Sequence, residues 1–80
     1  MTDDPAKTDI RPYFFDLWKK HHFHTGTLSI RSGVPEMIIL KMLRYQAVQR
    51  ADAEKVLLKV STLYRQSYTL ETVKIKLEDS

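Results

Sequence analysis

The chain has 80 residues, of which 42% are hydrophobic and 29% charged, and its formal net charge is +3. This length allows at most one compact domain, and the chain is too apolar to be intrinsically disordered. The longest aliphatic run, Met37 to Leu40, is far shorter than the roughly 20 residues of a membrane helix, so we expect no membrane partner. Residues 1–5 lack a basic region followed by an apolar stretch, and we therefore expect a cytoplasmic protein without a secretion signal.

The positive charge is concentrated in the middle of the chain. Residues 11–50 carry seven basic and two acidic side chains, whereas residues 1–10 are net acidic and residues 51–80 are balanced. A basic centre suggests a polyanionic partner, although a solvated basic surface is an equally open interpretation. The chain contains no cysteine, which excludes disulfides and thiolate metal sites.

The first third of the chain predicts a flexible lead and two helices. Residues 1–9 are polar and lack an apolar period, so we expect them to be flexible. Pro12 suits the first position of a helix, and apolar residues recur at helical spacing from there to about His24, namely Tyr13, Phe14, Leu17, Trp18 and His21. A short second helix follows through Leu28 and ends at Gly33, because glycine favours the left-handed conformation that stops helices.

The remainder predicts two further helices and a strand. Pro35 and Glu36 open a third helix that reaches about Tyr45, since both residue types favour a first helical turn. A fourth helix covers roughly residues 51–66, with one apolar stripe formed by Ala53, Val56, Leu57, Val60, Leu63 and Tyr64. A single helical turn is expected near residues 69–72. Alternating apolar and lysine residues over 73–77 then predict a short strand.

These elements predict a mainly α domain of four or five helices with a short C-terminal β-strand. Residues 1–9 form the lead, residues 10–72 the helical domain, and residues 73–80 the strand and tail. Two short helices joined around a glycine satisfy the geometry of a helix-turn-helix, in which the first helix stops abruptly and the second presents an open face.

The spacing within this pair resembles that of a known family. With Thr25 as the first position, the small, glycine and apolar positions are the fifth, ninth, tenth, fifteenth and eighteenth, occupied by Ser29, Gly33, Val34, Ile39 and Met42. These residues resemble the lambda-repressor-like helix-turn-helix family, also called Cro-type or xenobiotic-response-element-like domains. The likeness covers roughly residues 12–66. Ser29 stands where alanine is commonest in that family, and Tyr45 where such helices often end in glycine.

The resemblance implies sequence-specific binding of double-stranded DNA by a small transcriptional regulator, with residues 35–45 as the recognition helix in the major groove. On a helical wheel, one side faces the core and consists of Ile38, Ile39, Met42 and Leu43, while the other consists of Met37, Leu40, Lys41 and Arg44. Lys41 and Arg44 would reach phosphates or guanine, and Met37 and Leu40 would touch thymine methyl groups. Glu36 would accept from a cytosine amino group. The alternative is that Met37 and Leu40 are covered by protein.

Other DNA contacts are expected from backbone geometry and flanking charge. The second helix begins near Thr25 and Thr27, where free amide groups and the positive end of the helix dipole suit a phosphate. Arg31 and Arg50 flank the same face and would add salt-sensitive affinity, although each is equally consistent with a solvated surface charge.

A homodimer is predicted, because one recognition helix reads only a few base pairs. The C-terminal strand, through Val73, Ile75 and Leu77, is the candidate dimer contact, since a lone strand needs a partner. An intrachain partner near residues 8–10 is the equally open alternative. A different class of function is a protein-interaction adaptor, which would use Met37, Ile38 and Leu40 to bind a partner protein.

No catalytic or metal-binding pattern is present. The chain has only two glycines, so it lacks a glycine-rich phosphate loop, and no local spacing indicates a catalytic triad. His21 and His24 are neighbours on a helix, but two imidazoles are too few for a structural zinc site. We therefore expect no enzyme activity, cofactor, metal or dedicated small-molecule ligand. His21 is predicted to bond a backbone carbonyl at the core edge, with His22 and His24 on the surface.

Overall fold

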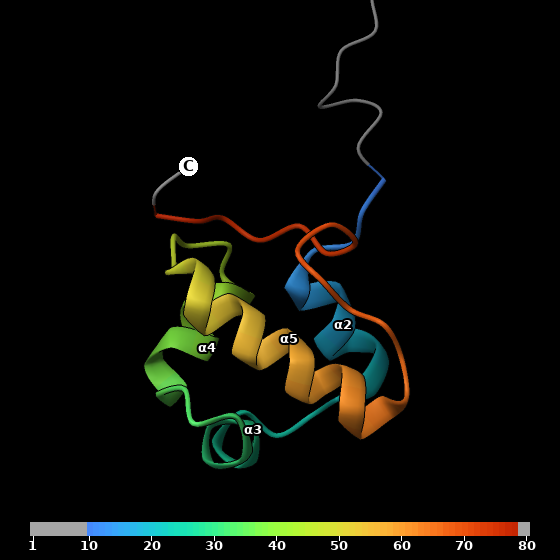
Figure 1. Ribbon diagram of the computed structural model, residues 1–80, viewed down its shortest axis with the longest axis vertical. Helices are drawn as coiled ribbons and strands as arrows, with labels where there is room; N and C mark the ends of the chain where they lie inside the picture. Colours follow the sequence, from blue (N-terminus) through green and yellow to red (C-terminus); the bar gives the residue numbers. More distant parts are fainter. Residues whose placement is uncertain (1–9, 79–80) are drawn as a thin grey trace, which may run out of the picture.

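The computed structural model describes residues 10–78, which form a mainly α domain (Figure 1). Within this range the helices are α2 (Phe14–His21), α3 (Thr25–Ser32), α4 (Glu36–Leu43) and α5 (Arg50–Tyr64). The predicted mainly α class is confirmed, and the predicted flexible lead lies outside the described residues. None of these helices has the length and apolar character needed to cross a membrane.

Helix α2 begins two residues later and ends three residues earlier than its apolar period predicts. The Pro12 carbonyl accepts the Lys74 amide at 2.7 Å, while the Asp16 carboxylate accepts the Tyr13 amide at 2.9 Å and so caps the helix start. At the other end, His22 has a φ of 54°, the left-handed conformation that ends helices. His24, the predicted end of this helix, instead caps α3.

Gly33 makes the predicted turn between α3 and α4. Its φ is 76°, which glycine adopts without steric cost, and its amide donates to the Ser29 carbonyl at 2.9 Å. The Ser29 hydroxyl donates to the Val34 carbonyl at 2.7 Å, so the serine that departs from the family pattern binds the turn directly. Tyr45, just after α4, has a φ of 55°, a left-handed conformation that glycine adopts more easily than other residues.

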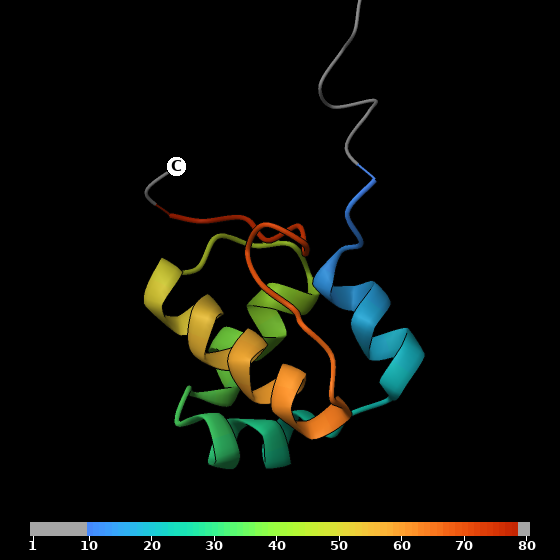
Figure 2. The same cartoon turned by 45° about the vertical axis from the view of Figure 1, so that its right-hand side comes forward.

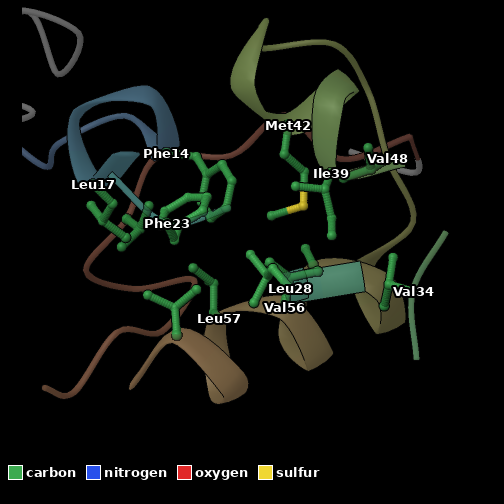
Figure 3. Packing of buried hydrophobic residues seen from close by; sticks show 13 residues of the cluster. Phe14, Leu17, Phe23, Leu28, Val34, Ile39, Met42, Val48, Val56 and Leu57 are labelled. Carbon is green, nitrogen blue, oxygen red and sulfur yellow. The ribbon is translucent and has the colours of Figure 1, made fainter. Parts of the chain in front are cut away.

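The core lies between α5 and the other three helices. Ile39 and Met42 of α4 point toward Leu28 of α3 and Val56 of α5 (Figure 3). The predicted stripe of α5 is confirmed for its four central members, which are buried, Ala53, Val56, Leu57 and Val60. Leu63 is 39% exposed, so its inclusion in the stripe was wrong. Tyr64, the last predicted member, is partly buried and packs against the core.

The C-terminal segment, residues 73–78, does not form a regular strand. It makes isolated parallel bridges from Lys74 to Tyr13 and from Leu77 to Val48. Figures 1 and 2 both show it running from the start of α2 to the loop between α4 and α5. The helical turn expected at residues 69–72 is a hydrogen-bonded turn, in which the Thr72 amide donates to the Thr69 carbonyl at 3.1 Å.

This pairing corrects the proposed dimer contact. Val73 is fully buried in the core, and Ile75 and Leu77 pack against that core from partly buried positions. Within the described residues the segment pairs inside the chain, with Tyr13 and Val48; residues 8 and 9 of the intrachain alternative lie outside the described residues. The apolar face that was assigned to a second copy is used inside the chain, because a lone segment of this kind gains most by covering its own core.

Candidate nucleic-acid interface

The outward face of α4 is exposed as the helical wheel predicts. Met37 is 72% exposed and Leu40 36%, Arg44 is exposed, and Lys41 is half-buried. Ile39 and Met42 are buried on the opposite side. The helix itself is shorter than the predicted 35–45, because Pro35 precedes its first residue and the chain turns at Arg44. We call the group Met37, Leu40, Lys41 and Arg44 the α4 face.

Thr25 and Glu36 contact each other. The Thr25 hydroxyl donates to Glu36 Oε2 at 2.7 Å, and this oxygen lies 3.6 Å from the point where Gly26 would carry a Cβ. A carboxylate therefore already occupies the surroundings of the α3 N-terminus. A phosphate bound at the predicted site would therefore have a negatively charged neighbour that repels it.

Thr27 and Arg31 lie on a different side of α3 from Thr25. They line a hollow with Leu63 and Tyr64 from the end of α5, and His24 Nδ1 accepts the Thr27 amide at 3.4 Å. The amide predicted to bind phosphate is thus already bonded to a side chain. Arg31 is exposed, but the structure groups it with the end of α5 and not with the α4 face.

Arg50 is the exposed first residue of α5. It follows the short loop that leaves α4, so it is close in sequence to the α4 face. The predicted DNA-contact residues are therefore divided among four places, of which the start of α5 with Arg50 is one. Met37, Leu40, Lys41 and Arg44 share the outward face of α4, Thr25 and Glu36 pair beside it, and Thr27 and Arg31 lie by α5.

A hollow of about 440 Å³ adjoins the α4 face. It is lined from α2, the α2–α3 connection and α4 by Trp18, His22, Phe23, His24, Thr25, Leu40 and Leu43. On the α2 side, the Phe15 and Trp18 rings stack with centroids 5.8 Å apart, and the His22 ring lies 5.4 Å from Trp18. The spacing of these rings, three and four residues, was visible in the sequence, but it could not show that Trp18 and His22 line a hollow together with α4.

His21 binds side chains and not the predicted backbone carbonyl. Its ring stacks on Tyr64 with centroids 4.0 Å apart, and its Nε2 lies 2.9 Å from the Tyr68 hydroxyl. Burial, and secondly the charge of Lys20, lower the pKa of His21 below its ordinary value of 6.5. His22 and His24 are exposed as predicted. The His21 contacts join the end of α2 to α5 and to the segment that follows it.

The lowered pKa means that the fold favours the neutral imidazole. Its contribution to stability is present above pH 6.5 and is lost as the pH falls through that value toward the lower pKa of the folded state. We therefore expect the melting temperature to fall between about pH 7.5 and pH 5.5. A His21→Phe variant, which keeps a ring against Tyr64 but does not titrate, should show a smaller fall. If the melting temperatures of the two proteins fell equally with pH, the fall could not be attributed to His21.

Among residues 10–78, no group of three histidine, aspartate or glutamate side chains is arranged to hold a metal ion. No protein-family model, curated protein or solved structure matches the chain.

Proposed function

We propose that the protein binds double-stranded DNA in a sequence-specific manner, as a small transcriptional regulator of the lambda-repressor-like helix-turn-helix type. The observation that carries this proposal is the α4 face itself. It is an exposed helix surface that follows a tight glycine turn and bears two cations and two apolar side chains. In this arrangement α4 is the recognition helix, and α3 supports it from behind.

The dimensions and charges of α4 suit the major groove. An α-helix with its side chains has a diameter of about 10–12 Å, which fits the roughly 12 Å width of the major groove. Lys41 and Arg44 would contact phosphates or guanine, while the neighbouring Glu36 carboxylate accepts a hydrogen bond from Thr25. Arg50 adds charge at the start of the next helix.

A two-copy complex remains part of the proposal. A single helix of this length contacts only a few base pairs, and useful affinity needs a second half-site about one helical turn away. Residues 73–78 pack within their own chain, which favours another surface for the contact between copies.

The proposal is tested by fluorescence anisotropy on mixed-sequence duplex DNA. Between about 50 and 200 mM salt, a complex with about four phosphate contacts should weaken on the order of 100-fold. The Lys41→Ala/Arg44→Ala variant should bind much more weakly, and the slope of log affinity against log salt should fall by about 2, since about one unit is lost per contact.

The matched control is Lys55→Ala/Lys59→Ala, which removes two positive charges from α5, outside the α4 face. It should leave both the affinity at low salt and the slope close to those of the unchanged protein. If the two double variants weaken binding equally, the attraction is a property of net charge alone and α4 is not the reading element.

A second candidate function is favoured by the exposure of Met37, which at 72% is high for a large apolar side chain. A protein-interaction adaptor would bury this side chain and Leu40 against a partner protein. Failure to bind any duplex at low salt would support this candidate over DNA binding.

A further inference from the structure

We propose that the α4 face selects DNA by the C5-methyl groups of its pyrimidines, so that its target carries thymine or 5-methylcytosine opposite Met37 and Leu40. This inference rests on the proposed function and specifies what the same surface recognises. It is carried by the distribution of apolar and polar groups along α4.

The first half of the α4 face is apolar. Met37 and Leu40 are three residues apart and therefore neighbours on the helix surface, and they are 72% and 36% exposed. Neither side chain forms a conventional hydrogen bond with a base edge. The apolar group that the major groove offers to such side chains is the C5-methyl group of thymine. The two side chains therefore favour methyl-bearing base pairs over unmethylated cytosine pairs.

The nearest polar side chain is directed elsewhere. Glu36 opens α4 and was predicted to accept from a cytosine amino group, but its carboxylate accepts the Thr25 hydroxyl at 2.7 Å. This contact draws it toward the start of α3, beside Gly26. The donors of the α4 face, Lys41 and Arg44, belong to the second half of the helix and its C-cap. Met37 and Leu40 consequently contact apolar groups of the bases, whereas Lys41 and Arg44 contact phosphates and guanine.

The hollow beside Leu40 extends this apolar surface. Leu40 and Leu43 line it from α4, and Trp18 lines it from α2. A base methyl group in contact with Leu40 would thus meet a largely apolar surrounding, which increases the area removed from water. The expected gain is about fourfold in affinity per contacted methyl group, the equivalent of burying one methyl-sized group.

The experiment compares duplexes that differ only in pyrimidine methyl groups. One pair is an A·T-rich duplex made with either thymine or uracil, and the other is a G·C-rich duplex made with either cytosine or 5-methylcytosine. Anisotropy at low salt should give tighter binding to the methylated member of each pair, by about fourfold or more. Because uracil and cytosine lack only the methyl group, phosphate contacts are equal within a pair.

Two variants locate the effect. Met37→Ala should reduce the ratio of affinities within each pair. Because Met37 is highly exposed, this variant should remain folded, which thermal unfolding checks directly. Leu58→Ala removes an apolar side chain of similar exposure, 68%, from α5 and should leave the ratio unchanged. Equal affinity for both members of each pair would overturn the methyl inference while leaving DNA binding intact. Absence of binding to every duplex would overturn the proposed function as well.

Discussion

Ile39→Ala is expected to lower the free energy of unfolding by about 2–5 kcal/mol, the usual cost of removing a large aliphatic side chain from a packed core. Met37→Ala, two residues earlier on the same helix, should change it by less than about 0.5 kcal/mol. The difference arises from burial alone, since Ile39 is 0% exposed and Met37 is 72% exposed. Ile39 lies between α3 and α5, so its loss leaves a cavity where three helices meet (Figure 3).

Urea denaturation followed by circular dichroism measures both variants on one scale. The whole domain is expected to have a stability of only about 4–12 kcal/mol, so the Ile39 variant should lose a large part of it. Similar denaturation midpoints for the two variants would mean that Ile39 is not on the buried side of α4 or that Met37 is not on the exposed side. It would also remove the basis for assigning Met37 to the DNA-facing side.

Truncation after Thr72 is expected to destabilise the protein by at least about 4 kcal/mol, combining the burial of one valine with the loss of several backbone hydrogen bonds. It removes fully buried Val73. It also removes the Lys74 amide donated to Pro12, the Lys76 carbonyl that accepts the Val48 amide, and the Glu78 amide donated to Val48. The cut therefore releases both the start of α2 and the loop that follows α4.

Thermal unfolding of the truncated chain tests this expectation, and point variants separate its two components. Val73→Ala should lower the melting temperature through the core alone, whereas Lys76→Ala, at an exposed position, should have little effect because only its backbone is used. A truncated chain as stable as the complete one would show that residues 73–78 contribute nothing to the core and would reopen their assignment to a partner.

The helices and the two sides of α4 were predictable because they depend on local rules. Apolar residues at helical spacing located α2 and α5, Pro35 and Glu36 located the start of α4, and the left-handed preference of Gly33 located the turn between α3 and α4. The helix ends were less predictable. α2 begins after Pro12, whose carbonyl is bonded to the distant Lys74, and it stops before His24, which caps α3 instead. Such limits depend on hydrogen bonds that the spacing within one helix does not contain.

The candidate site was predicted in part. Exposure of Met37, Leu40 and Arg44 follows from the period of α4, because a helix can bury only one side against the core. The separation of Thr27 and Arg31 from this face depends on how α3 is rotated against α5. That rotation is a property of packing between helices, and no spacing within one helix contains it.

The sequence by itself determined the mainly α class, the turn at Gly33 and the inner and outer sides of α4, because each depends on residues within a few positions of one another. Only the tertiary structure decided where the C-terminal segment packs, which groups His21 meets and where the Glu36 carboxylate goes. Each of these joins residues whose distance in space is unrelated to their distance along the chain. Long-range packing and hydrogen bonding choose among several locally acceptable partners, and that choice is made by the complete fold.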